Sequence, residues 1–364
     1  LFNTTAMTIQ AYERFVFIRL CLIIACVLQP CINLLLLYHG GNVVTISVAT
    51  LVISFLTYVV YYCYAKKVLD LKYKFDNFDK NLFKNIFVFS AFLFLNTITD
   101  QLTFSTDNII LGIFSGSIMV AIYSVGSNFK NYFMAFSTSA SSVFAPKINK
   151  IIAESGSDDE TNEIFIRIGR IQFYIVTLIL LGYIFLGRQF VYLWVGNEYS
   201  DAYWIGLLLM ISVYVPCFQN IGLEIQKAKN MHKARSVVYF LIAIVNIIIT
   251  IPLSLLYGGI GASFATCLCM FIGTVIFMNI YNYKKVGIDI PAFWKSIFRI
   301  LPGMIIPIVY GVFINCFINI NSYWNLLFVI LGFVLVYFLS CWFFSMNHYE
   351  KDIFSKPLKR FLKK

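Results

Sequence analysis

The chain has 364 residues, of which 60% are hydrophobic and 12% are charged, and its formal net charge is +11 at pH 7. A soluble globular domain carries about 25% charged residues, so this composition excludes a soluble protein and indicates a polytopic membrane protein. The apolar runs continue for about 20 residues, which favours membrane helices over the alternating strands of a membrane barrel. We therefore expect an all-α membrane fold.

Ten apolar stretches of the sequence are predicted to cross the membrane as helices. They cover residues 15–38, 43–64, 85–112, 118–145, 168–193, 203–225, 234–256, 260–282, 294–318 and 323–345. Most end at Gly, Pro, Asn or a cluster of Lys residues, as helix ends do. An even number of spans places both termini on the same side of the membrane.

The basic residues indicate which side that is. Of the 28 Lys and Arg residues, 26 flank the predicted spans on one side, while Lys130 lies inside a span and Arg188 lies on the other side. The positive-inside rule makes the basic side cytoplasmic. This pattern predicts a multi-pass protein of the bacterial inner membrane with cytoplasmic termini, and it explains the net charge without a nucleic acid ligand.

Two connections between spans have a distinct composition. Residues 65–84 are basic with interspersed Phe and Tyr, which predicts an amphipathic cytoplasmic linker on the membrane surface. Residues 153–163, AESGSDDETNE, are predicted to form a solvated polar loop.

Residues 87–146 contain two predicted spans that meet at a Ser115-Gly116-Ser117 turn, which predicts an antiparallel membrane hairpin. The polar residues of each arm recur at helical spacing and therefore lie on one helix face. They are Asn96, Asp100, Thr103 and Asp107 on the first arm, and Tyr123, Ser127, Lys130, Ser137 and Ser141 on the second.

Two opposite charges of this hairpin are expected at one depth. Asp100 lies 15 residues before Ser115, and Lys130 lies 13 residues after Ser117. At about 1.5 Å per residue, both are roughly 20 Å from the turn in a hydrocarbon core of about 30 Å. An ionisable group at such depth costs at least about 2.5 kcal/mol and normally faces a partner or a watery cavity. The hairpin is predicted to line a polar passage, and a structural Asp100–Lys130 ion pair is the competing explanation.

No pattern in the sequence indicates an enzyme, a cofactor or a metal site. The nine cysteines lie in or at the ends of apolar spans, which is typical of small buried hydrophobic residues. The three histidines have no carboxylate or serine partner at motif spacing, and no nucleotide-binding GxxxxGK[ST] loop occurs. We therefore expect a protein without catalytic residues.

Three stretches of the chain carry a family resemblance. The first is DNIILG at 107–112 with AIYS at 121–124 and FAP at 144–146, the second is FVYLWVGNEY at 190–199, and the third is Asn246, Pro252 and YGGIGASFAT at 257–266. In this order they resemble the polysaccharide transporter family of the multidrug/oligosaccharidyl-lipid/polysaccharide exporter superfamily. Its members are flippases for O-antigen and capsule repeat units, in the biosynthesis of lipopolysaccharide and other surface polysaccharides.

The resemblance implies a two-lobed architecture around a central cavity that opens alternately to each side of the membrane. The expected division has five parts: 1–64 as the remnant of an N-terminal lobe, 65–84 as the linker, 85–283 as a C-terminal six-helix lobe, 284–345 as two additional spans, and 346–364 as a basic cytoplasmic tail. About four N-terminal spans of such flippases are then expected to be absent from this sequence.

The resemblance also implies a substrate, an oligosaccharide linked to undecaprenyl pyrophosphate, whose anionic group needs positive charge in the cavity. Lys130 is the first candidate to bind the pyrophosphate and Arg19 the second, although Arg19 is also placed to snorkel to the interface. The candidates for coupling to H⁺ or Na⁺ are Asp100, Asp107 and Glu224, and Asp100 is favoured because it lies deepest. A structural role at a helix end is the competing explanation for Asp107, and an interfacial position is the competing explanation for Glu224. The expected polar lining of the cavity is Asn96, Thr103, Tyr123 and Ser127.

The expected partners are the lipid-linked oligosaccharide, membrane lipids, a polysaccharide polymerase and a chain-length regulator. Three other functions stay open. A drug/cation antiporter of the same superfamily would favour an acidic cavity, so Lys130 counts against it. A lipid II flippase would differ mainly in its substrate. A membrane polysaccharide polymerase or acyltransferase would require a catalytic group that the sequence does not reveal.

Overall fold

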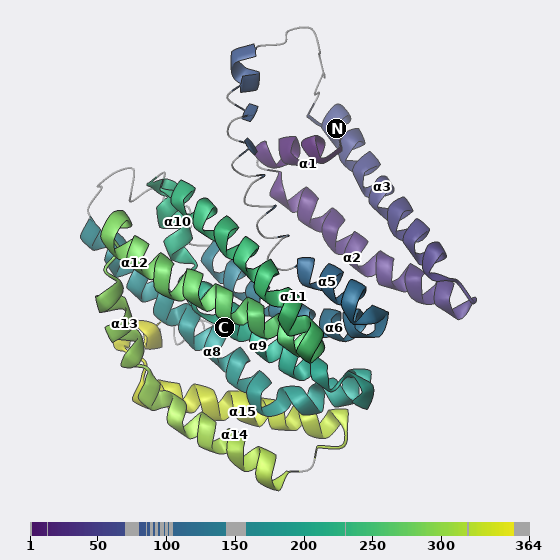
Figure 1. Ribbon diagram of the computed structural model, residues 1–364. Helices are drawn as coiled ribbons and strands as arrows, with labels where there is room; N and C mark the ends of the chain where they lie inside the picture. The colour runs from purple at the N-terminus through teal and green to yellow at the C-terminus, as the bar shows by residue number, and fades with distance from the viewer. Residues whose placement is uncertain are drawn as a thin grey trace, which may run out of the picture. The chain divides into compact units, whose positions relative to one another are not determined.

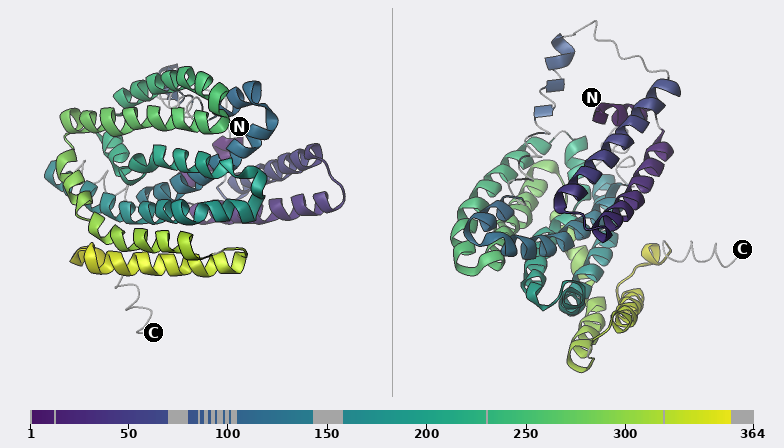
Figure 2. Two further views of the ribbon diagram at one scale, coloured as in Figure 1. Left: turned by 60° about the horizontal axis from the view of Figure 1, so that its bottom comes forward. Right: turned by 90° about the vertical axis from the view of Figure 1, so that its right-hand side faces the viewer.

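The computed structural model consists of helices, and no strand occurs among the residues that it describes. These residues are 2–12, 14–69, 80–84, 86–87, 90–91, 94, 98, 101, 105–142, 158–229, 231–318 and 320–352. The chain divides into two compact units, Leu1–Asn85 and Ile86–Lys364. Figures 1 and 2 show their helices from three directions. The predicted all-α class is confirmed.

The first unit is a helical hairpin with a short helix beside it. Its elements are α1 (Phe2–Ala11), α2 (Phe15–Tyr38) and α3 (Val43–Lys67). The two long helices are antiparallel, because Phe17 stacks on Tyr64 while Gln29 donates a hydrogen bond to Thr50 at 3.3 Å. Most apolar side chains of α2 are exposed within the unit, as expected for a helix that contacts lipid.

The second unit begins with the predicted hairpin. The turn separates α5 (Thr106–Phe114) from α6 (Gly116–Ser142). Gly116 has a φ of +85°, a left-handed conformation that glycine adopts without steric cost. Tyr123 on α6 donates a hydrogen bond to Asp107 on α5, so the two helices are antiparallel. The hairpin is therefore confirmed next to its turn, while part of its first arm lies outside the described residues.

Two further long helices pack against α6. They are α8 (Asp158–Val195) and α9 (Asp201–Phe218), with the short 3₁₀ helix η1 (Asn197–Tyr199) between them and α10 (Ile221–Ala228) after them. Gly126 and Gly206 face each other where α6 crosses α9: a Cβ atom on Gly206 would lie 3.2 Å from the carbonyl oxygen of Gly126. Small residues allow membrane helices to approach this closely, and the approach tightens the core around the hairpin.

The start of α8 corrects one prediction. Residues 158–163 are helical, so the expected polar loop over 153–163 is wrong for that part. Asp159 and Glu160 lie in the first turn of α8, where negative charge is favourable beside the positive end of the helix dipole. Glu163 also forms an i,i+4 ion pair with Arg167, which adds local support for the helix.

The predicted spans 234–256 and 260–282 form two helical arms of one segment, which reverses direction between them. Its elements are α11 (His232–Met270), the π-helix η2 (Phe271–Phe277), α12 (Met278–Tyr281) and the π-helix η3 (Asn282–Val286). The reversal occurs at Gly258, whose φ is +57°. The hydroxyl of Tyr281 donates a hydrogen bond to the carbonyl oxygen of Met231 at 3.1 Å, so the two arms of this segment are antiparallel.

The C-terminal helices pack against α8. They are α13 (Ile290–Phe298), the 3₁₀ helix η4 (Leu301–Met304), α14 (Ile305–Phe317) and α15 (Tyr323–Phe344). The expected single span 294–318 is in fact a helix pair bent by 42°, because Pro302 lacks the N–H that would continue the helix. Arg170 of α8 donates hydrogen bonds to both carboxylate oxygens of Glu350, at 2.5 and 3.0 Å. This buried ion pair connects the segment after α15 to α8.

The protein is a multi-pass membrane protein. Within the described part of the chain, six helices are long and apolar enough to cross a membrane, or seven if the bent pair counts as one span. Of the ten predicted spans, 234–256 and 260–282 both fall within the single range Arg235–Val286, part of 85–112 lies outside the described residues, and α6 is not among the six helices. The polar face of α6 lowers its hydropathy, which sets it apart from an ordinary lipid-embedded helix. The five-part division of the chain stays a prediction.

Candidate functional site

A buried carboxylate joins three helical segments of the second unit. Asp107 lies in the first turn of α5 and is 1% exposed. Tyr123 of α6 donates a hydrogen bond to its Oδ2 atom. Thr266, on the second arm of α11, donates to the same oxygen at 2.9 Å. The hairpin and the α11 segment are therefore held together by one acidic group.

The polar network continues along α11. Asn246 Nδ2 donates a hydrogen bond to Thr266 Oγ1 at 3.2 Å, and Thr250 Oγ1 donates to Asn246 Oδ1 at 3.3 Å. These side chains are almost fully buried. A carboxylate surrounded by hydroxyl and amide oxygens is a donor set that holds a proton or a small hard cation. We call Asp107, Tyr123, Asn246, Thr250 and Thr266 the acidic network.

Lys130 places a positive charge on the same helix face. It is 4% exposed and lies seven residues after Tyr123 on α6, which corresponds to about 10 Å along the helix. Its charge is opposite to that of the Asp107 carboxylate on the other arm of the hairpin. Burying an ammonium group at such depth costs about 2.5 kcal/mol or more, so a cation here is expected to have a function or a firm structural role.

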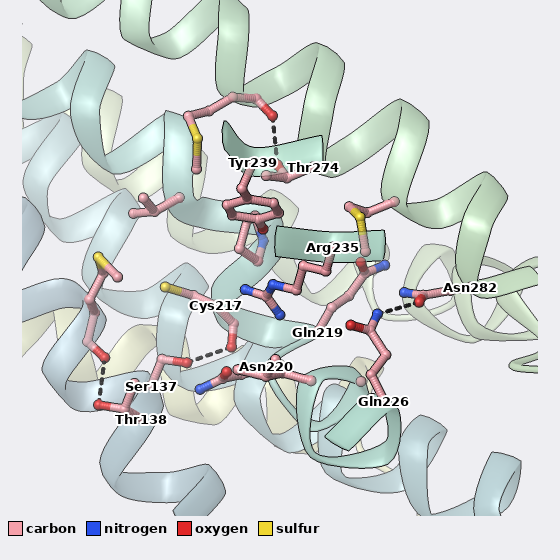
Figure 3. Close-up of a pocket in the computed structure, with 17 residues that line it drawn as sticks. Ser137, Thr138, Cys217, Gln219, Asn220, Gln226, Arg235, Tyr239, Thr274 and Asn282 are labelled. Carbon is pink, nitrogen blue, oxygen red and sulfur yellow. Dashed lines mark hydrogen bonds between the residues drawn. The ribbon is translucent and has the colours of Figure 1, made fainter. Parts of the chain in front are cut away.

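A polar pocket lies at the end of the second unit where the connecting segments carry Lys227, Lys229, Lys284 and Lys285, which we call the basic end. The pocket has a volume of about 250 Å³ and is lined by residues of α6, α9, α10, α11, η2, α12 and η3. Figure 3 shows the Arg235 side chain extending into it, among amide and hydroxyl groups. Asp107 and Lys130 do not line this pocket. We call it the Arg235 pocket.

The Arg235 pocket combines one positive charge with several neutral hydrogen-bonding groups. The guanidinium carbon of Arg235 lies 4.7 Å from the centroid of the Tyr239 ring, a cation–π contact that orients the side chain. Gln226 donates to Asn282 Oδ1 at 2.5 Å, and Gln219 donates to Asn279 Oδ1 at 3.0 Å. Gln226 Oε1 is buried without a hydrogen-bond partner among the described residues. Guanidinium and amide groups suit a ligand with phosphate and hydroxyl groups.

The remaining predicted site residues are spread over both units. Arg19 is exposed on α2 in the first unit. Glu224 on α10 forms an ion pair with Lys227 at 2.9 Å, away from the acidic network. Ser127 is half-buried and donates to the Ser124 carbonyl oxygen of its own helix at 3.0 Å. Asn96, Asp100 and Thr103 lie outside the described part of the chain. The competing Asp100–Lys130 ion pair therefore lies outside it as well.

The sequence alone assigned no role to three residues of the acidic network, nor to Arg235. Asn246 and Thr266 belong to the third resemblance stretch, and Thr250 follows Asn246 by four residues, which is the spacing of one helix face. Arg235 was counted only among the basic residues that flank the spans. The available signal was an Asn and a Thr on one face of an otherwise apolar span, because polar side chains in such spans normally face the protein interior.

The comparisons with known proteins agree with this fold. A family described as "Polysaccharide biosynthesis protein" matches residues 3–203. The solved structure of "Lipid II flippase MurJ, inward closed conformation" is similar, with a TM-score of 0.70 and 18% sequence identity over 98% of this chain and 71% of that chain. No curated protein sequence matches. Since the family match covers more than half of the residues, this chain belongs to the polysaccharide biosynthesis protein family, and the resemblance to polysaccharide transporters is confirmed.

Proposed function

We propose that this protein moves a lipid-linked oligosaccharide across the bacterial inner membrane by alternating access. The carrier lipid is undecaprenyl pyrophosphate, and the product serves the synthesis of O-antigen, capsule or exopolysaccharide. Family membership and the likeness to a flippase fold support this proposal. The observation that carries it is the pair of buried opposite charges, Asp107 and Lys130, on the two arms of one membrane hairpin.

The substrate explains why cations are needed along the path. A pyrophosphate cannot cross the hydrocarbon core unless positive charge compensates it. We assign this task first to Lys130, with Arg19 as the second candidate. Arg235, in its pocket at the basic end, is placed to receive the phosphate and sugar groups when the substrate enters from the cytoplasm. The topology that makes this end cytoplasmic rests on the positive-inside rule.

The acidic network supports coupling of the movement to an ion. Asp107 connects the hairpin with the α11 segment, so a proton or Na⁺ bound there would change the attraction between these two parts. An ion shifts a conformational equilibrium only if it binds the two states differently, and a carboxylate shared between helices provides such a difference. Asp100 and Glu224 stay candidates for the same task, with Asn96, Thr103, Tyr123 and Ser127 as the polar lining.

The proposal is tested by deletion of the complete gene followed by localisation of the lipid-linked glycan. We expect the intact repeat unit to accumulate on the cytoplasmic leaflet and the surface polysaccharide to disappear. Complementation with Lys130→Gln should restore little surface polysaccharide. The matched control is Lys295→Gln, which removes an exposed charge on α13 and should restore it fully.

Two other outcomes of the same experiment would refute the proposal, and a third would refute only the role of Lys130. Repeat units that reach the outer leaflet but are not polymerised would identify a polymerase. Normal surface polysaccharide together with sensitivity to cationic drugs would identify a drug/cation antiporter. Full restoration by Lys130→Gln would remove the lysine from the transport path while leaving the flippase proposal intact.

A second candidate substrate is lipid II, because the similar solved structure is that of a lipid II flippase. Both substrates are lipid-linked and share a polar head group, so the fold alone does not separate them. Expression of this protein in cells depleted of their lipid II flippase separates the two. Rescue of growth would favour lipid II, and continued lysis would favour an oligosaccharide for surface polysaccharide, made with a polymerase and a chain-length regulator.

A further inference from the structure

Arg188 is the one basic residue that the sequence places on the side of the membrane opposite to the basic loops. The proposed function does not use it. In the structure, Arg188 lines a pocket of about 380 Å³ at the end of the second unit opposite to the basic end. We infer that this pocket binds the phosphate-bearing sugar head of the lipid-linked substrate after it has crossed the membrane. This inference rests on the proposed function and adds a site on the release side.

Two segments that are distant in the sequence, residues 188–200 and 320–321, build this pocket, which we call the Arg188 pocket. The last turns of α8 contribute Arg188, Gln189 and Tyr192, and the connection through η1 contributes Gly196, Asn197 and Ser200. The connection between α14 and α15 contributes Ile320 and Asn321. Apart from Gly196 and Ile320, every lining residue has a polar group that can contact a ligand.

Side-chain contacts hold these segments together. The hydroxyl of Tyr323, at the start of α15, donates a hydrogen bond to the Leu193 carbonyl oxygen of α8 at 2.5 Å. Gln189 Nε2 donates to Asn315 Oδ1 of α14 at 2.9 Å. The other amide atom, Gln189 Oε1, is buried and has no hydrogen-bond partner among the described residues. The α8–α9 and α14–α15 connections are therefore fixed relative to one another, and an acceptor in the pocket wall is left for a donor such as a sugar hydroxyl.

The charge of Arg188 is available to an anion. Its side chain is exposed, and none of the ion pairs among the described residues involves it. The nearest acidic residues in the sequence, Glu198 in η1 and Asp201 at the start of α9, do not line the pocket. A guanidinium group binds phosphate oxygens with two parallel hydrogen bonds, which an ammonium group cannot do.

Aromatic residues around the Arg188 pocket indicate its depth in the membrane. Tyr192 and Trp194 near the end of α8 are 57% and 47% exposed, and Tyr323 and Trp324 at the start of α15 are 60% and 70% exposed. Exposed Tyr and Trp residues gather where a membrane protein crosses from lipid to water. The pocket therefore lies at the level where a polar head group emerges while its lipid remains in the membrane.

A lipid-linked sugar phosphate fits this combination better than a phospholipid does. Both carry a phosphate for Arg188, but only the sugar offers the many hydroxyl groups that pair with the amides of Gln189, Asn197 and Asn321. The ring of Tyr192 presents an amphipathic surface against which a sugar ring can pack. Specificity then comes from the polar lining, because a buried acceptor left unpaired by a wrong ligand carries a free-energy cost.

The test measures protection of a cysteine in this pocket. Ser200→Cys is introduced into the chain, and the protein is placed in nanodiscs of phosphatidylcholine. The rate of its reaction with a membrane-impermeant maleimide is measured, and the rate of the parent protein is subtracted. Undecaprenyl-pyrophosphate-linked repeat unit, phosphatidylglycerol or inorganic pyrophosphate is then added in separate experiments.

We expect the repeat unit to slow the labelling, while phosphatidylglycerol has little effect. Arg188→Gln should weaken the apparent affinity for the repeat unit roughly ten- to hundredfold, the range for removal of one partner of charged hydrogen bonds. The apparent affinity of Arg188→Lys should lie between those of the parent protein and Arg188→Gln, because lysine keeps the charge but cannot form the two parallel hydrogen bonds. Arg299→Gln removes an exposed Arg at the basic end and should leave the protection unchanged.

Three results would overturn the inference. Equal protection by phosphatidylglycerol would mean a lipid head-group site, and protection by inorganic pyrophosphate alone would mean a site for free phosphate. Protection that persists in a well-folded Arg188→Gln protein would exclude the arginine. The proposed function fails separately: it fails if deletion of the complete gene leaves surface polysaccharide normal, whereas the Arg188 inference fails if deletion abolishes the polysaccharide and the labelling is not protected.

Discussion

Replacement of Thr266 by Val tests whether the acidic network stabilises the fold. The substitution keeps the shape of the side chain and removes only the hydroxyl group. That hydroxyl donates to Asp107 at 2.9 Å, accepts from Asn246 Nδ2 at 3.2 Å and lies 3.4 Å from Asn246 Oδ1. Because a hydroxyl has a single hydrogen, it can donate to only one of these oxygens at a time, so the substitution removes about two hydrogen bonds.

The expected loss follows from these contacts. Hydrogen bonds between membrane helices contribute about 0.6 kcal/mol on average and up to about 1.7 kcal/mol. Two such bonds predict that Thr266→Val lowers the free energy of unfolding by about 1–3 kcal/mol. Thr266→Ser keeps the hydroxyl and should recover most of that loss, because the remaining difference is one methyl group.

The measurement is reversible unfolding in mixed micelles of dodecyl sulfate and a mild detergent, followed by circular dichroism. The control is Thr274→Val in the π-helix η2. Thr274 is also buried, at 4% exposure, but it donates only to the Met270 carbonyl oxygen of its own helix, at 2.7 Å. Its loss should change the free energy of unfolding by less than about 0.6 kcal/mol. If both variants lose the same amount, the network contributes no more than a local helix contact, and the reasoning is wrong.

Three other variants test separate parts of the second unit. Arg170→Gln should lower the free energy of unfolding by about 3–5 kcal/mol, because it leaves Glu350 buried without its cation. Replacement of both residues by methionine should lower it much less. The same unfolding assay checks this, and equal losses in the two variants would contradict it. Gly126→Ala should destabilise the fold by about 1–3 kcal/mol, because its methyl group would lie 2.7 Å from a side chain of α9. Gly182→Ala is the control and should be tolerated, because its methyl group would meet no atom within 4 Å. Lys130→Arg should restore more surface polysaccharide than Lys130→Gln but less than the wild type, because the larger guanidinium keeps the charge in a site packed for an ammonium. If Lys130→Arg restores no more than Lys130→Gln, the positive charge alone does not support transport.

Much of the fold could be predicted because membrane helices obey local rules. A run of about 20 apolar residues must be helical, since the lipid offers no partner for backbone groups. The hairpin turn at Gly116 was predictable for the same reason, from a short polar break between two such runs. Hydropathy alone shows one span over 294–318, because apolar residues continue on both sides of the bend, but Pro302 indicates a kink there, since a proline within a span kinks the helix.

Only part of the candidate site could be predicted from local sequence patterns. The spacing of polar residues on α6 identified Tyr123, Ser127 and Lys130 as members of one face, because that pattern is a property of a single helix. No pattern within one helix could pair Asp107 with Thr266, which are separated by 159 positions. Nor could it show that Arg235 enters a pocket, because basic residues at span ends are usually topology signals.

The sequence by itself determined that the protein lies in the membrane, that it is helical, which face of α6 is polar and which family it resembles. These properties follow from composition and from spacing along single helices. The tertiary structure alone decided that Asp107 is shared among three helical segments, that Arg235 enters a pocket, and that Arg188 and Gln189 lie beside Asn321 of a distant segment. The reason is that each of these sites is formed by helix packing, which brings together residues that no local pattern connects.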